Sequence, residues 1–132
     1  MINIMPTYGR IDLSFERGDG PWLFTEDGRK YLDFASGIAV NTLGHSNKEL
    51  INVLIEQSKK VWHTSNLYNI KPQSDLAKLI CQNSFGESVF FCNSGAESLE
   101  GTIKLCRRFH FNNGDIEKTN ILVCSSAFHG RT

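Results

Sequence analysis

The segment from Ser88 to Phe111 constrains the fold of this chain more than any other. An apolar, β-prone run at residues 88–92 leads into the small corner Ser94-Gly95-Ala96, after which apolar residues recur at helical spacing. We expect a helix from Ala96 to about Phe111, with an apolar stripe that would pack on a sheet. A strand that leads directly into such a helix is the first half of a βαβ unit.

A second apolar run, residues 121–124, follows the polar turn at Asn112–Asp115. Two short, almost wholly apolar strands joined by an amphipathic helix predict a parallel pair with a right-handed crossover. The predicted fold class is therefore α/β. We expect residues 1–45 to form an N-terminal arm and β-hairpin, and residues 46–132 to be the start of a larger, truncated domain.

Local signals predict the elements that precede this unit. Residues 1–20 read as an irregular arm. Two aromatic-rich runs, Trp22–Thr25 and Lys30–Phe34, flank an Asp-Gly turn and predict a β-hairpin. The S-x-x-E pattern at Ser46 predicts the cap of a helix that runs to about His63.

One more helix is expected before the Ser88–Phe111 segment. Pro72 stands where the first turn of a helix tolerates proline, and Phe85-Gly86 would end that helix.

The corner at Gly95 is a candidate anion site. The first N–H groups of a helix have no partner within it, and the helix dipole adds positive potential there. Phosphate is the anion most often held in this way. The amides of Gly95 and Ala96 and the hydroxyl of Ser94 are the expected donors. The alternative is that Ser94 and Glu97 only form a capping box, with no ligand.

The residues after the second predicted strand form a second candidate. Ligands of open α/β sheets gather at the carboxyl ends of the strands, so both loops are expected at one edge. Phe128 would stack on a flat heteroaromatic ligand or pack in the core. Arg131 has a planar fork that suits a carboxylate or phosphate, although most loop arginines only face solvent.

Composition excludes several classes of function. Fourteen basic and fourteen acidic side chains cancel, so there is no bulk charge to attract nucleic acid or a membrane surface. The four cysteines lie far apart, which favours reduced, buried thiols in a cytoplasmic protein. The four histidines have no ligand spacing, so no metal site is predicted. No signal peptide or membrane span is visible, and 132 residues suffice for a sizeable core.

Three motifs in this chain resemble the class III pyridoxal-phosphate aminotransferases. They are Phe91–Glu97 with Glu100, Lys104 and Arg107; Ala127–Thr132; and Tyr31–Val40 with Leu43-Gly44-His45. The resemblance runs in order from about Gly18 onward. It implies the start of the large domain of fold type I and the cofactor pyridoxal 5'-phosphate.

The resemblance also assigns roles to the candidate residues. It implies that Ser94, Gly95 and Ala96 bind the cofactor phosphate, and that Phe128 stacks on the pyridine ring. Arg131 would hold the substrate carboxylate. The implied reaction moves an amino group from N-acetylornithine to 2-oxoglutarate in arginine biosynthesis, in a cytoplasmic homodimer. Succinyldiaminopimelate, ornithine and 4-aminobutyrate are the alternative amino donors.

Two departures from the family pattern stand out. Ser98-Leu99 replaces a common Ala-Asn pair, inside the expected helix and without consequence for phosphate binding. The family's cofactor-bearing lysine and the aspartate that faces the pyridine nitrogen have no counterpart before Thr132, so no catalytic residue is assigned. We expect an N-terminal piece of an aminotransferase, inactive alone. The alternative is a non-catalytic phosphate-binding or interaction module.

Overall fold

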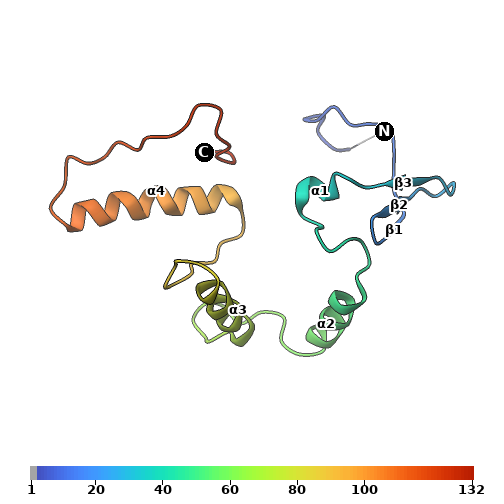
Figure 1. Cartoon of the computed structure of the whole chain (residues 1–132), viewed down its shortest axis with the longest axis horizontal. Coiled ribbons are helices and arrows are strands. Elements are labelled where there is room, and N and C mark those ends of the chain that lie inside the picture. The colour runs from blue at the N-terminus through green and yellow to red at the C-terminus, as the bar shows by residue number, and fades with distance from the viewer. Residues whose placement is uncertain (1–2) are drawn as a thin grey trace. The chain divides into compact units, whose positions relative to one another are not determined.

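The computed structural model of the chain describes residues 3–132 and contains two compact units. The first unit ends at Tyr68 and the second is Asn69–Thr132. Figure 1 shows the elements of each unit along the chain. Each unit is described by itself.

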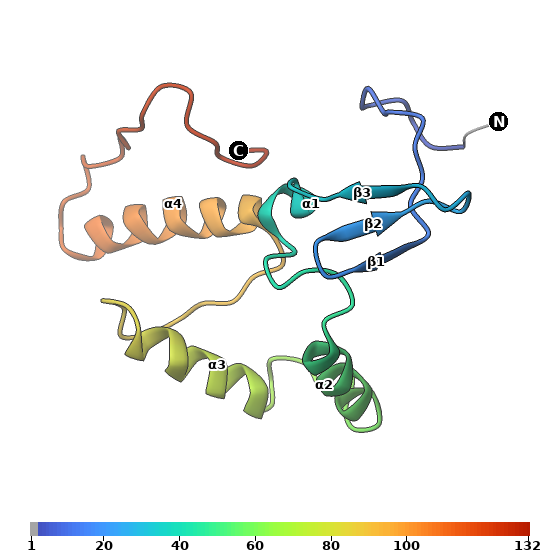
Figure 2. The same ribbon diagram turned by 45° about the vertical axis from the view of Figure 1, so that its right-hand side comes forward.

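The first unit contains a three-stranded antiparallel sheet, β1-β2-β3. The strands are Arg17–Asp19 (β1), Trp22–Phe24 (β2) and Lys30–Leu32 (β3), and Figure 2 shows them side by side. The β2–β3 pair confirms the predicted hairpin. β1 corrects the expectation that residues 1–20 are an irregular arm throughout. Their last residues pair with β2 because a tight turn at Gly20-Pro21 folds the chain back.

Cations lie over aromatic rings on neighbouring strands of this sheet. The Arg17 guanidinium lies 3.6 Å from the ring centre of Phe24, and Lys30 Nζ lies 3.8 Å from that of Trp22. Each pair joins β2 to one of its neighbours. Such cation–π contacts, together with cross-strand pairing, stabilise a small sheet that has no second layer.

Helix α2 (Lys48–Ser58) follows, and its cap differs from the predicted one. Asn47 is the N-cap: its Oδ1 accepts the N–H groups of Glu49 and Leu50 at 3.0 and 3.2 Å. The predicted cap, Ser46, has a φ of 55° and donates its hydroxyl to the Gly18 carbonyl at 2.7 Å. The prediction was wrong because the Ser46 hydroxyl is engaged by the distant Gly18 carbonyl, while Asn47, an equally good cap, stands next to the helix.

Replacing Asn47 with alanine is expected to fray the first turn of α2. Loss of an N-cap costs about 1 kcal/mol, so the Glu49 and Leu50 amides should exchange with solvent about fivefold faster. Ser46→Ala is the matched control and should leave both rates unchanged. Hydrogen exchange followed by NMR measures this. Equal effects of the two variants would restore Ser46 as the cap.

Helix α2 also ends earlier than the predicted His63. The indole Nε1 of Trp62 donates to the carbonyl of Ser58 at 2.7 Å, and the Gln57 amide donates to the Val61 carbonyl at 3.0 Å. A tryptophan that folds back onto the last carbonyls satisfies groups that a helix end leaves open. The apolar residues Val61 and Trp62 therefore fold back onto the end of α2 and do not extend it.

The second unit contains helices α3 (Lys71–Gln82) and α4 (Gly95–Asn112). Pro72 is the second residue of α3, which confirms its predicted place in a first turn. α3 ends before the predicted Phe85-Gly86, since the Asn83 side chain donates to the Leu79 carbonyl at 2.9 Å. α4 matches the predicted helix to within a residue at each end.

The predicted parallel strand pair is absent from the described residues. Residues 89–92 and 121–124 flank α4, but neither forms a ladder in this structure. A strand is stabilised by hydrogen bonds to a partner, and consecutive strands of a parallel sheet are not always neighbours. The local sequence pattern identified an apolar segment on each side of α4. It could not show whether partner strands are present for these segments to pair with.

No hydrophobic side chain in residues 3–132 is buried. The predicted core is therefore absent. Among residues 3–132, the helices of each unit pack on no other element, and only the strands contact one another. The expectation of buried cysteines fails for the same reason: Cys92, Cys106 and Cys124 are exposed and Cys81 is half-buried, and all four are free. The apolar faces of these helices lack the layer that would cover them.

Candidate functional site

The corner between residues 92 and 95 forms the capped start of α4. Ser94 is extended, with φ −156° and ψ 162°, and its Oγ accepts the Glu97 N–H at 3.2 Å. The Glu97 carboxylate accepts the Asn93 N–H at 2.5 Å. This is the predicted capping box, except that the glutamate reaches one residue further back than usual. In this cap the Ser94 oxygen acts as a hydrogen-bond acceptor. The hydrogen of the same hydroxyl remains available as a donor.

Two donors remain at this corner. Within the described part of the chain, the amides of Gly95 and Ala96 donate to no protein group. They are the first two N–H groups of an 18-residue helix, where the dipole favours negative charge. A Cβ built on Gly95 would meet no atom within 4 Å. A side chain at position 95 would therefore project into open space.

The chain after α4 returns to this corner. In Figures 1 and 2 the segment that follows α4 runs back along the helix and ends near its first turn. Gly130 marks the contact: a Cβ there would lie 3.0 Å from Ala96 Cα and 3.1 Å from its nitrogen. Ala96 and Gly130 are both half-buried. The structure thus brings the two predicted loops together through backbone contact, without the sheet that was expected to align them.

Phe128 and Arg131 flank this contact and are both exposed. The Phe128 side chain is 89% exposed, so it does not pack in a core within the described residues. Arg131 lies in a tight turn closed by the Thr132 N–H, which donates to the His129 carbonyl at 3.1 Å. The second unit therefore places an aromatic ring and a guanidinium on the loop that touches the start of α4.

This arrangement suits a ligand that carries a phosphate and a flat ring. Backbone amides at a helix start bind anions, an exposed ring stacks on heteroaromatic groups, and an arginine fork pairs with a carboxylate. The two amides of the first helical turn that donate to no protein group in the described residues are the feature of this corner that fits such a group. The described residues contain no group of three His, Cys, Asp or Glu side chains placed to hold a metal ion.

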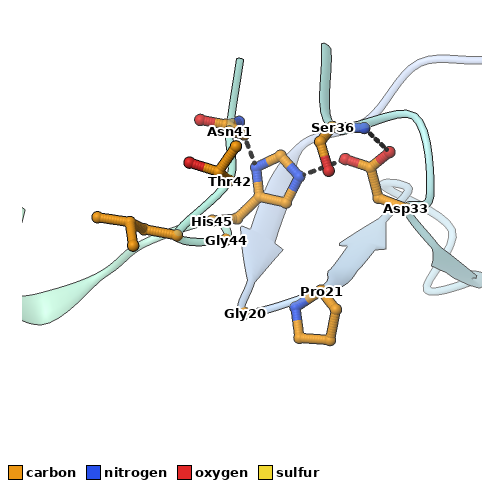
Figure 3. A pocket seen from close by; sticks show the side chains of 9 residues that line it. Gly20, Pro21, Asp33, Ser36, Asn41, Thr42, Gly44 and His45 are labelled. Carbon is orange, nitrogen blue, oxygen red and sulfur yellow. Dashed lines mark hydrogen bonds and ion pairs between the residues drawn. The ribbon is translucent and has the colours of Figure 1, made fainter. Parts of the chain in front are cut away.

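A separate cavity of about 270 Å³ lies in the first unit. Figure 3 shows Asp33 and His45, which both line it, with their side chains turned toward each other. His45 Nε2 lies 2.7 Å from Asp33 Oδ2, and the Asp33 side chain is only 9% exposed. The other carboxylate oxygen accepts the N–H groups of Ala35 and Ser36 at 3.1 and 2.8 Å. The carboxylate is therefore fully engaged by the protein.

These bonds hold a left-handed turn, α1 (Ser36–Ala39), in which all four residues have positive φ, between 47° and 64°. Each non-glycine residue in this conformation costs roughly 1–2 kcal/mol. Asp33 binds the start of the turn. The other ring nitrogen of His45, Nδ1, lies 3.2 Å from the side-chain Nδ2 of Asn41, just beyond the turn. The pair offsets the strain by fixing both ends.

The turn is expected to weaken in acid. The hydrogen bond from His45, and then the bond from Ser36, lowers the pKa of Asp33 below its usual 3.8. The bonds therefore stabilise the turn at every pH above that value, and the contribution is lost as the pH falls through the lower, folded pKa. The Ala35 and Ser36 amide proton shifts should titrate with a midpoint below 3.8.

Asp33→Asn is the matched control for this titration, because its side chain cannot ionise. The two amide shifts should then no longer titrate in this range. A wild-type midpoint at or above 3.8 would contradict the assigned bonds.

Sequence reasoning missed two features of these sites. The Asp33–His45 pair joins residues twelve positions apart, and the only local signal was an aspartate after a strand. The Gly130 contact joins the two candidate loops, and its signal was a glycine between His129 and Arg131. Neither partner can be identified without the fold.

The family model and the curated relatives that match this chain point to the same family. The family model of class-III aminotransferases matches residues 4–132. An acetylornithine aminotransferase from Agrobacterium fabrum is 51% identical over 129 residues, which is 98% of this chain and 32% of that relative. The chain thus spans about a third of the length of the curated relatives it matches.

Solved structures agree on the fold. The N-acetylornithine aminotransferase from Stenotrophomonas maltophilia is 41% identical with a TM-score of 0.75, covering 81% of this chain and 30% of that one. An ornithine aminotransferase from Toxoplasma gondii, with PLP at partial occupancy in its active site, has a TM-score of 0.87 at 21% identity, over 98% and 31% of the two chains. The predicted α/β class is confirmed. None of the described helices is both long and apolar enough to cross a bilayer.

Proposed function

The chain belongs to the class-III aminotransferase family, and we propose that it is the amino-terminal part of a pyridoxal-phosphate enzyme. We call the longer protein the parent. It would transfer the amino group of N-acetylornithine to 2-oxoglutarate, a step of arginine biosynthesis. The observation that carries the proposal is the approach of Gly130 to Ala96, which sets the loop bearing Phe128 and Arg131 against the start of α4. The relatives named acetylornithine aminotransferase support the choice of amino donor.

The residues of this chain would hold the cofactor at one end. The amides of Gly95 and Ala96 and the hydroxyl of Ser94 would bind its phosphate, because none of them donates to a protein group in the described residues. Phe128 would stack on the ring, which its exposure allows. When bound, pyridoxal phosphate supplies the electron sink that amino transfer requires.

Arg131 would orient the substrate. Its planar guanidinium pairs with a carboxylate through two parallel hydrogen bonds. N-acetylornithine donates its δ-amino group, because its α-amino group is acetylated, so Arg131 would bind a carboxylate at the opposite end of that substrate from the reacting carbon. 2-Oxoglutarate has a carboxylate at each end, and Arg131 would bind one of them, so one arginine would serve both halves of the reaction. The pairing fixes the reacting carbon relative to the cofactor, which is the kind of positioning that lowers a barrier without new chemistry.

The 132 residues by themselves would not transaminate. The lysine that carries the cofactor in this family has no counterpart among them. The parent would act in the cytoplasm as a homodimer. The four free cysteines are compatible with a reducing compartment.

The test is an assay of the purified parent with pyridoxal phosphate and 2-oxoglutarate. N-acetylornithine, ornithine, succinyldiaminopimelate and 4-aminobutyrate are offered separately as amino donors, and glutamate formation is measured. We expect the highest kcat/KM with N-acetylornithine. A higher value with another donor would reassign the substrate. Cofactor binding without amino transfer from any donor would overturn the reaction and leave a phosphate-binding protein.

A further inference from the structure

Gly130 is the residue through which the second loop touches α4, and its role goes beyond chain flexibility. We propose that Gly130 is a positioning residue that seats the Phe128–Arg131 loop on the first turn of α4 while leaving the Ala96 amide uncovered. The inference rests on the proposed function, because the ligand that needs this amide is the cofactor phosphate. It adds a residue that contacts neither cofactor nor substrate in that proposal.

The backbone of the loop requires glycine for its conformation. Gly130 has a φ of +66°, and Arg131 is not among the residues with positive φ. With the His129 carbonyl accepting the Thr132 N–H at 3.1 Å, Gly130 is the first central residue of a tight turn and has a positive φ there. Glycine is strongly favoured at the first central position of that turn. The turn sets the direction of Arg131, which occupies the next position.

The surroundings of Gly130 impose a second requirement. A Cβ there would stand 3.0 Å from Ala96 Cα, 3.1 Å from its nitrogen and 3.2 Å from its Cβ. Two of these atoms are backbone atoms of the first helical turn and cannot rotate away. Hydrogen bonds from an amide to a phosphate oxygen span about 2.7–2.9 Å. A methyl group at position 130 would therefore crowd the nitrogen that, in the proposed function, donates to a phosphate oxygen.

The chain offers a control that separates these two requirements. Gly114, in the turn after α4, has a φ of +83°, but a Cβ there would meet nothing within 4 Å. Alanine at position 114 therefore imposes a comparable left-handed strain without a close contact. Gly114 also lies outside the two candidate loops, so its replacement leaves the proposed binding residues untouched.

The experiment compares Gly130→Ala with Gly114→Ala in the parent. Two quantities are measured: the dissociation constant of pyridoxal phosphate, followed by its visible absorbance, and the KM for 2-oxoglutarate. Gly130→Ala is expected to weaken cofactor binding by about tenfold or more, the loss of one charge-assisted hydrogen bond, and to raise KM as Arg131 moves. Gly114→Ala should leave both within about twofold. Urea unfolding of both variants shows whether their stabilities fall alike.

A second variant tests the same contact without altering the turn. Ala96→Val keeps the backbone amide and adds methyl groups where α4 meets Gly130, and valine in a helix costs only a few tenths of a kcal/mol. It should reproduce the cofactor defect even if Gly130→Ala does not fold. Equal cofactor affinities for Gly130→Ala and Gly114→Ala, or wild-type affinity for Ala96→Val, would overturn the inference.

The wild-type protein separates this inference from the proposed function. A parent that binds no pyridoxal phosphate would refute the proposed function itself. A parent that binds the cofactor normally, with Gly130→Ala behaving like Gly114→Ala, would refute only the role of Gly130.

Discussion

Gly95→Pro is expected to weaken pyridoxal phosphate binding to the parent by about 10- to 100-fold while leaving α4 intact. The substitution removes one N–H donor, and a hydrogen bond to a charged group contributes about 1.5–3 kcal/mol. Proline is favoured at the first position of a helix, where Gly95 stands. Ser94 already has the extended conformation, with ψ 162°, that a following proline demands.

Gly95→Ala is the matched control for this substitution. It keeps the amide and adds only a Cβ, which would meet no protein atom within 4 Å. Any loss of affinity in this variant measures crowding of the ligand by the Cβ alone. The dissociation constant is obtained by titrating the apoprotein with the cofactor, and circular dichroism confirms that the helix content is preserved. Equal affinities for the two variants would mean that the Gly95 amide does not bind the phosphate.

Arg131→Ala is expected to raise the KM of the parent for both N-acetylornithine and 2-oxoglutarate by about 10- to 100-fold. Each substrate would lose a paired, charge-assisted contact to its carboxylate. Cofactor affinity should stay within about twofold, because the proposed phosphate donors are backbone amides and the Ser94 hydroxyl. Steady-state kinetics with each substrate, and a cofactor titration of the same preparation, measure the two effects.

Arg131→Lys tests the geometry of the contact. Lysine keeps the positive charge but cannot form two parallel bonds to a carboxylate, so its KM should lie between those of wild type and Arg131→Ala. A KM unchanged in both variants would show that another residue binds the carboxylate. A defect confined to cofactor binding would instead move Arg131 to the phosphate.

Local chemistry predicted the elements whose signals lie within a few residues. The hairpin formed because Asp27-Gly28 provides a turn, and Gly28 has a φ of +84°. Pro72 correctly marked the start of α3. Two S-x-x-E patterns gave opposite outcomes: Ser94 caps α4, whereas Asn47 displaces Ser46 at α2. Both residues are good caps, and the competition was decided by the bond between Ser46 and Gly18, which is not local.

Features that depend on distant partners could not be predicted. The apolar runs at 89–92 and 121–124 were recognised, but strands also need neighbours, and none pairs with them here. The strained turn at Ser36–Ala39 forms because His45 binds Asp33, a pairing that no spacing rule indicates. At the candidate site, the sequence pattern placed a helix start at Gly95, which the structure has, but it could not indicate that the second loop reaches this helix start through Gly130.

The central claim is that the amides at the start of α4 hold the cofactor phosphate, and a crystal structure of the parent with pyridoxal phosphate tests it most directly. We predict phosphate oxygens about 2.7–3.1 Å from the nitrogens of Gly95 and Ala96, with the ring stacked on Phe128. A cofactor bound with its phosphate away from both amides would contradict the account.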